Sequence, residues 1–179
     1  SDEALTALLE EVLDASEQGG EDLGPSFFEV TIAAAFLAFS REPADACVVE
    51  VGLGGRFDAT NVLEPDVLAA CGIAALGLDH EKFLLAPEEG VPKEPMARIA
   101  FEKAGSAKEG VPLVTLHDPY PPEAQAAIKE VNNRIGAKLH EGFCGYYFDN
   151  GLGNYLPNLT DCATLAPSLS GEHQLQNLG

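Results

Sequence analysis

Carboxylate and imidazole side chains stand at the ends of two apolar segments that are typical of parallel strands. Glu50 lies in the apolar run 46–51, which leads into the glycine-rich loop 52–61. A second apolar run, 67–75, leads to His80. Because parallel sheets gather ligands beyond the carboxyl ends of their strands, this topology would bring Glu50, the loop and His80 to one edge. These residues are therefore the first candidates for a site.

Glu50 and His80 each have a functional and a structural interpretation. A carboxylate within an apolar strand is costly without a partner, so we expect Glu50 to meet a metal ion, another cation or a strong hydrogen-bond donor. Its structural interpretation is a buried salt bridge or a hydrogen bond at the strand end. His80 either ligates a metal or caps the turn that follows it. A carboxylate and an imidazole, completed by waters and phosphate oxygens, can hold Mg²⁺. The presence of both residue types favours the metal site.

The phosphate-binding and cationic candidates are weaker by themselves. Glycines at positions 52, 54 and 55 permit positive φ and close backbone approach, but no G-x-x-x-x-G-K-S/T phosphate loop occurs within the 179 residues. Lys103, near the end of a predicted helix, is expected to be a solvated cation at the helix terminus.

Helical and strand-like periodicities alternate along the chain. A capping box formed by Ser26 and Glu29 marks one helix start, and Gly136 marks one helix end. Four helices are predicted: one that begins near 5–13 and ends near positions 19–20, one that follows Ser26, one at 96–104 and one at 122–135. The helix after Ser26 carries an apolar stripe and is predicted to be buried on more than one side; the stripe consists of Phe28, Ile32, Phe36 and Phe39. Three strands are predicted: 46–51, 67–75 and 111–116.

These elements predict an α/β fold, with a largely parallel sheet flanked by helices. Segments around Lys138, Tyr146 and Tyr155 are separated by glycine, asparagine and proline, which predicts short antiparallel strands near the C-terminal end. The segment 171–179 has the pattern of a helix that begins there.

The composition excludes some partners. The 29 Asp and Glu residues against 10 Lys and Arg give a formal net charge of −19, which repels nucleic acid and anionic membranes. Cys47 and Cys71 lie in apolar runs and are predicted to be buried thiols, as in a cytoplasmic protein. We find no leader and no run of about 18 apolar residues that could cross a membrane.

Five sequence blocks together resemble folylpolyglutamate/dihydrofolate synthases of the Mur ligase superfamily. They are 26–31 (SFFEVT), 50–61 (EVGLGGRFDATN), 78–80 (LDH), 102–105 (EKAG) and 171–174 (GEHQ), in the family's order. The resemblance implies that residues 1–179 are part of a Mur-type central ATPase domain. It further implies that the N-terminal phosphate-loop segment and the C-terminal domain lie outside them, so the isolated chain is expected to be inactive and to self-associate through exposed edges.

The resemblance also assigns roles to residues. It implies that Glu50 and His80 ligate Mg²⁺ and that Lys103 is carbamylated, which turns a cation into a carboxylate at the metal site. It implies that the adenine and ribose of ATP are bound by His173, Gln174 and Asn177. It places three residues on the folate side: Ser26, Phe28 and Arg56.

In the chemistry that this resemblance implies, ATP phosphorylates a carboxylate of folate or dihydropteroate, and the amino group of L-glutamate then displaces phosphate. Two features depart from the family pattern. His80 and Lys103 lie 23 positions apart, because 86–95 has the character of a loop insertion that would displace Lys103, and Ser106-Ala107 replaces a bulkier pair. A noncatalytic binding or assembly module, and another Mur ligase with an amino-acid substrate, are the alternatives.

Overall fold

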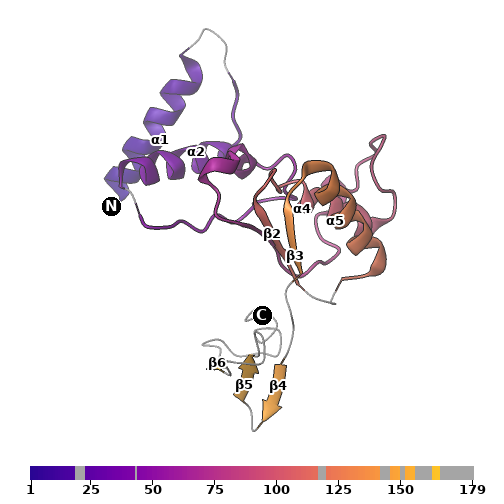
Figure 1. Cartoon of the computed structure of the whole chain (residues 1–179). Helices are drawn as coiled ribbons and strands as arrows, with labels where there is room; N and C mark the ends of the chain where they lie inside the picture. The colour runs from indigo at the N-terminus through magenta and orange to yellow at the C-terminus, as the bar shows by residue number, and fades with distance from the viewer. Residues whose placement is uncertain are drawn as a thin grey trace. The chain divides into compact units, whose positions relative to one another are not determined.

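The computed structural model describes residues 1–18, 23–42, 44–116, 120–141, 146–149, 152–155 and 163–165. The chain divides into two compact units, Ser1–Val62 and Leu63–Gly179, and most of their helices and strands are labelled in Figure 1. Among the described residues, no helix is both long enough and apolar enough to cross a membrane.

The first unit is built on a pair of packed helices, α1 (Asp2–Glu17) and α2 (Phe27–Arg41). Both were predicted. An ion pair joins the two helices, with 2.6 Å between Arg41 Nη2 and Glu11 Oε1, and both side chains are about half exposed. A short 3-10 helix, η1 (Ala59–Val62), follows the glycine-rich loop and contacts α2.

The predicted capping box at the start of α2 is confirmed. The Ser26 N–H donates to Glu29 Oε2 at 2.7 Å, and the Glu29 N–H donates to Ser26 Oγ at 3.3 Å. Burial along α2 is narrower than predicted, since only Val30 and Ala34 are buried. The predicted stripe is part-buried at its centre and exposed at Phe28 and Phe39.

The predicted strand at 46–51 is wrong. These residues form no regular secondary structure, and Val48 is 99% exposed. Cys47 is exposed rather than buried, and Cys71 is only part-buried. An apolar run becomes a strand only when a neighbouring strand takes up its backbone hydrogen bonds, and no described strand pairs with this segment.

The second unit contains a three-stranded parallel sheet in the order β1-β2-β3, which confirms the predicted fold class. Its elements are η2 (Pro65–Val67), β1 (Cys71–Ile73), α3 (Glu81–Leu84), α4 (Pro95–Ala104), β2 (Pro112–Thr115), α5 (Pro122–Ile135) and β3 (Lys138–Glu141). Lys138 pairs with Pro112 in a parallel register, so the prediction of an antiparallel strand there is wrong. Helix α5 carries the chain back to the starting end of the sheet, and that crossover makes β2 and β3 parallel.

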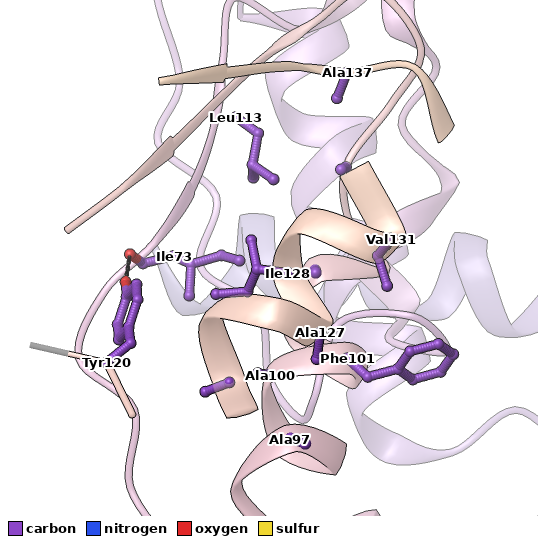
Figure 2. Close-up of a cluster of buried hydrophobic side chains, with 13 residues drawn as sticks. Ile73, Ala97, Ala100, Phe101, Leu113, Tyr120, Ala127, Ile128, Val131 and Ala137 are labelled. Carbon is purple, nitrogen blue, oxygen red and sulfur yellow. Dashed lines mark hydrogen bonds between the residues drawn. The ribbon is translucent and has the colours of Figure 1, made fainter. Parts of the chain in front are cut away.

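The core of the second unit lies between the sheet and the helices α4 and α5 (Figure 2). Leu113 on β2 is fully buried on the helix side, whereas its neighbour Val114, on the opposite face, is 42% exposed. Small residues such as Ala100, Ala104 and Ala124 are fully buried and let the two helices approach closely.

Tyr120 ties the carboxyl ends of β1 and β2 together. Its hydroxyl donates to the Ile73 carbonyl oxygen, 2.5 Å away (Figure 2). The same hydroxyl accepts from the Leu116 N–H at 3.2 Å. Burial raises the pKa of this phenol, although the hydrogen bond from Leu116 acts the other way.

A separate antiparallel sheet is formed by β4 (Tyr146–Asp149), β5 (Leu152–Tyr155) and β6 (Ala163–Leu165). The strands pair in sequence order. The prediction of short antiparallel strands in this part of the chain is thus confirmed for Tyr146 and Tyr155.

Candidate functional site

The glycine-rich loop is built around one buried carboxylate, that of Asp58. Its Oδ2 accepts from the Leu53 N–H at 2.8 Å, and its Oδ1 accepts from the Thr60 N–H at 2.9 Å and the Thr60 hydroxyl at 2.6 Å. The residue is 8% exposed. Because Asp58 immediately precedes η1, its bond to Thr60 resembles that of a helix-capping side chain. The Asp58 side chain therefore joins the beginning of the loop, at Leu53, to its end, at Thr60.

The charge state of Asp58 follows from these bonds. Burial by itself would raise the pKa of the carboxyl group, but the hydrogen bonds from Thr60, Leu53 and Gly52 favour the charged form, and the net result is a lowered pKa. The loop thus surrounds a fixed anion. Sequence reasoning missed this role, although an Asp-x-Thr pattern before a short helix is a recognisable capping signal.

Phe28, one of the three residues expected on the folate side, packs directly on the glycine-rich loop. A Cβ added to Gly52 would lie 2.3 Å from Phe28 Cζ, so only glycine allows this approach of the ring. Ser26, two residues before Phe28, uses its hydroxyl to cap α2, and the hydrogen bonds between Ser26 and Glu29 lower the pKa of Glu29. The structure therefore brings Phe28 to the loop and gives Ser26 a structural role.

Arg56, the third of these residues, lies at the loop's exposed side. Its guanidinium carbon is 4.2 Å from the centroid of the Phe57 ring, and that ring is 81% exposed. The Arg56 carbonyl accepts from Asn61 Nδ2 at 2.9 Å. A cation stacked on an exposed aromatic ring can present both a charge and an apolar face to a ligand.

Glu50 lies two residues before the loop and is exposed. The expectation of a carboxylate within a buried strand is wrong, because the segment is neither a strand nor buried. The structural interpretation, a buried salt bridge or a hydrogen bond at a strand end, is therefore excluded. An exposed carboxylate oxygen is free to bind a cation from solvent.

His80 precedes the four-residue helix α3 in an unusual backbone conformation. Its φ of 52° and ψ of 29° are left-handed, and among the residues that the structure describes it is the one non-glycine residue with positive φ. Its N–H donates to Asp79 Oδ1 at 2.7 Å, and its Nε2 lies 3.5 Å from Asp79 Oδ2. The imidazole does not cap α3 and is exposed, so the capping alternative is wrong. Strained backbone of this kind is concentrated at functional sites.

Lys103 lies in the last turn of α4 and is half-buried. The segment 85–94, between α3 and α4, is not helical; it contains all of the predicted insertion 86–95 except Pro95, which begins α4. Glu94 caps α4, since its Oε2 accepts from the Ala97 N–H at 2.7 Å, and Pro95 begins the helix.

The candidate donors for Mg²⁺ are distributed over both units. Glu50 belongs to the first unit and His80 to the second. No cluster of three or more His, Cys, Asp or Glu side chains occurs within the described ranges. A carboxylate and an imidazole fit a cation that retains several waters. His173, Gln174 and Asn177, the expected nucleotide-binding residues, lie outside the described residues.

Two features of the second unit were not predicted. Arg98 on α4 is buried, with its Nη2 2.8 Å from Glu88 Oε2 and its Nε 2.9 Å from Glu102 Oε1. Arg98 Nε and Glu102 Oε1 form an ion pair, but their geometry is not that of a hydrogen bond. The i,i+4 spacing of Arg98 and Glu102 in a helical pattern was an available signal.

The second unpredicted feature is a small pocket, about 90 Å³, at the carboxyl ends of β2 and β3. Its walls include Thr115, Tyr120, Lys129 and Glu141. Lys129 Nζ is already paired with Glu141 Oε1 at 2.9 Å, so the pocket offers no unpaired charge from these two side chains.

Comparison with known proteins gives consistent matches. No protein-family model matches the chain. Over 192 residues it is 36% identical to dihydrofolate synthase/folylpolyglutamate synthase of Bacillus subtilis, a match that covers 99% of the chain and 40% of that protein. Over 155 residues it is 36% identical to a folylpolyglutamate synthase of Arabidopsis thaliana, covering 87% of the chain and 21% of that protein. The chain thus spans two fifths or less of these relatives.

Solved structures show the same fold. Folylpolyglutamate synthase from Thermotoga maritima aligns with a TM-score of 0.70 and 28% identity, over 99% of the chain and 39% of that protein. A bifunctional folylpolyglutamate synthase/dihydrofolate synthase from Yersinia pestis, complexed with AMPPNP and a Mn ion, aligns with a TM-score of 0.67 and 25% identity, over 96% of the chain and 39% of that protein.

Proposed function

Since this chain belongs by homology and fold to the folylpolyglutamate/dihydrofolate synthases, we propose that it forms part of the central domain of an ATP-dependent ligase that joins L-glutamate to folate or dihydropteroate. The match to the Bacillus subtilis protein over 99% of the chain is the observation that carries this proposal. The architecture of the loop 52–61 supports it, because a buried anion and a close aromatic contact hold the most distinctive block of the sequence.

The proposed reaction has two steps. A carboxylate oxygen of the pterin substrate attacks the γ-phosphorus of ATP, which forms an acyl phosphate and releases ADP. The glutamate amino group then attacks the acyl carbon, loses a proton and expels phosphate, which leaves an amide bond. A divalent ion, when bound, neutralises the charge that develops on the phosphoryl oxygens.

The chain's own residues have positioning roles in this proposal. Glu50, His80 and a carbamylated Lys103 would hold the ion, and His173, Gln174 and Asn177 would contact the adenine and ribose of ATP. Phe28 and Arg56 would shape the folate side, with Ser26 fixing the start of the helix that carries Phe28. The AMPPNP and Mn ion bound to the Yersinia pestis relative support the nucleotide and metal parts of the proposal.

The test uses a polypeptide that carries these 179 residues with the flanking sequence of its gene. We expect phosphate release that depends on ATP, L-glutamate and either dihydropteroate or reduced folate. Replacement of either expected ligand, Glu50→Gln or His80→Asn, should raise the Mg²⁺ concentration for half-maximal release by about tenfold or more. Glu42→Gln, at an exposed glutamate of the same unit as Glu50, is the control and should leave the Mg²⁺ dependence unchanged.

Two outcomes would contradict the proposal. One is an unchanged Mg²⁺ dependence in both ligand variants. The other is a folded, longer protein that binds nucleotide but releases no phosphate with any pterin substrate, which would favour a noncatalytic module. Release that requires a different acceptor would indicate another Mur-type ligase. The isolated 179-residue chain is expected to show no turnover.

A further inference from the structure

The segment 85–94 joins the two candidate groups of the second unit, His80 and Lys103, and α4 holds it at two points. At its end, Glu94 caps α4 through the Ala97 N–H. Near its middle, Glu88 Oε2 lies 2.8 Å from Arg98 Nη2. The segment is therefore tied to the first turns of α4 rather than projecting freely into solvent.

Arg98 is unusual among the described cations because its side chain is only 6% exposed. A buried guanidinium is strongly unfavourable unless acidic partners compensate it. Glu102, 7% exposed at its side chain, faces Arg98 Nε from within α4, and Glu88 faces the outer end of the guanidinium from the loop. Arg98 is thus shared between its own helix and the loop, and the planar guanidinium allows one residue to reach both carboxylates.

Helix α3, which His80 precedes, cannot fix its own position. It has four residues, and so short a helix is not stable without tertiary contacts. Helix α3 packs against α4, the helix that follows it in the sequence. The left-handed backbone at His80 also persists only where the surrounding structure imposes it. Whatever holds the loop on α4 therefore contributes to the placement of His80.

We propose that Arg98 is a positioning residue, which holds Glu88 and the loop 85–94 on α4 and thereby sets the placement of His80 relative to Lys103 for the metal–nucleotide complex. This inference rests on the proposed function, in which these two groups serve one divalent ion. Arg98 itself contacts neither metal nor substrate. Its effect passes through Glu88 and the loop.

Glu88→Gln in the longer polypeptide tests this inference. Glu88 is 38% exposed at its side chain, and glutamine preserves its size while it removes the charge that faces Arg98. The buried Arg98–Glu102 pair stays intact, so the variant is expected to fold. Glu89→Gln is the matched control, since Glu89 is an exposed glutamate next to Glu88 in the same loop. Arg98→Lys is a second variant, which keeps the charge and loses the planar donor fork.

Two measurements are needed. Hydrogen exchange reports loop anchoring, and we expect the amides of 85–94 to exchange about tenfold faster in Glu88→Gln and Arg98→Lys than in Glu89→Gln. Calorimetry with Mg²⁺ and a nonhydrolysable ATP analogue reports metal binding without turnover. We expect about a fivefold weaker Mg²⁺ affinity in the same two variants, which corresponds to roughly 1 kcal/mol.

The outcomes separate this inference from the proposed function. If the unmodified protein binds no Mg²⁺ with the analogue, the proposed function fails, and this inference fails with it. If it binds Mg²⁺ normally but Glu88→Gln equals Glu89→Gln in exchange and affinity, only the inference is overturned. Faster loop exchange with an unchanged Mg²⁺ affinity also overturns it, because Arg98 would then anchor the loop without positioning the metal site.

Discussion

Asp58→Asn is the sharpest perturbation of the glycine-rich loop, because it changes one atom type at the point where the loop is closed. Asparagine can still accept from Thr60 through its carbonyl oxygen. Its NH2 group would then replace the oxygen that accepts from the Leu53 N–H at 2.8 Å, so that two donors face each other. The bonds from Thr60 at 2.6 and 2.9 Å remain, but they lose their charged acceptor.

The cost follows from the number and kind of these bonds. A hydrogen bond to a charged group contributes about 1.5–3 kcal/mol, and a buried donor without an acceptor costs a similar amount. We therefore expect the free energy of opening the loop to fall by about 2–3 kcal/mol. Because about 1.4 kcal/mol is a factor of ten, the Leu53 and Thr60 amides should exchange roughly 30- to 150-fold faster.

The pH dependence identifies the charge as the cause. The pKa of Asp58 is lowered in the folded protein, whereas an unperturbed aspartate has a pKa of about 3.9. The stability contributed by its charge is therefore fully present above about pH 4 and is lost as the pH falls through the folded-state pKa. The difference between the unmodified protein and Asp58→Asn should be full at pH 7 and should shrink in acid.

The assay is amide hydrogen exchange, with Asp45→Asn as the control. Asp45 is an exposed aspartate of the same unit, and its replacement should leave both amides as protected as before. Equal protection in the two variants at pH 7 would refute the role of Asp58. A difference of the same size at pH 7 and in strong acid would show that shape, and not charge, holds the loop.

Two further predictions concern packing and the sheet. Gly52→Ala places a Cβ within 2.3–2.8 Å of three ring atoms of Phe28, so the ring should move away and the free energy of unfolding should fall by about 1 kcal/mol. Urea denaturation would measure the loss of stability, and NMR shifts would report the movement of the ring. Phe28→Leu in the Gly52→Ala background should recover most of that stability. Tyr120→Phe removes the hydroxyl between the Leu116 N–H and the Ile73 carbonyl and should cost about 1–3 kcal/mol in urea denaturation. Since burial raises the pKa of Tyr120, the unmodified protein loses stability as the pH rises above about 10, and the gap between the two proteins should narrow there.

Local signals predicted helices α4 and α5 well. The stretch 122–135 corresponds to α5, and Gly136 ends it in a left-handed conformation with φ of 81°. The stretch 96–104 lacks only Pro95, which begins α4. Periodicity, proline at a helix start and glycine at a helix end all act over a few residues, so the sequence contains what is needed to place such elements.

Strands were harder to predict because their partners are distant in the sequence. The apolar run 46–51 has strand composition but finds no partner among the described strands, and Glu50 is consequently exposed instead of buried. The run 67–75 yields only the three residues of β1. The direction of the strand at Lys138 was predictable in principle, because a helix between two neighbouring strands of one sheet makes them parallel.

The sequence supplies the residue types of the candidate site but not their environment. Glu50 and His80 are both exposed, and the left-handed backbone of His80 and the buried Asp58 are products of the folded loops that hold them. A pattern of residues shows which groups could act. It does not show which neighbours hold those groups in place.

The two proposed metal ligands, Glu50 and His80, are held in place by different parts of the structure. The support of His80 explains how it can act together with Lys103 although the two are far apart in the sequence. Asp58 holds the loop that follows Glu50 through bonds that span only a few residues. The support of His80 comes from α4, because the loop 85–94 returns to that helix at Glu88 and at Glu94. When a loop is tied back to the helix that follows it, extra residues lengthen the path along the chain without lengthening the distance in space. The 23 positions between His80 and Lys103 are therefore no argument against their acting on one ion, provided that the contact between Glu88 and Arg98 is kept.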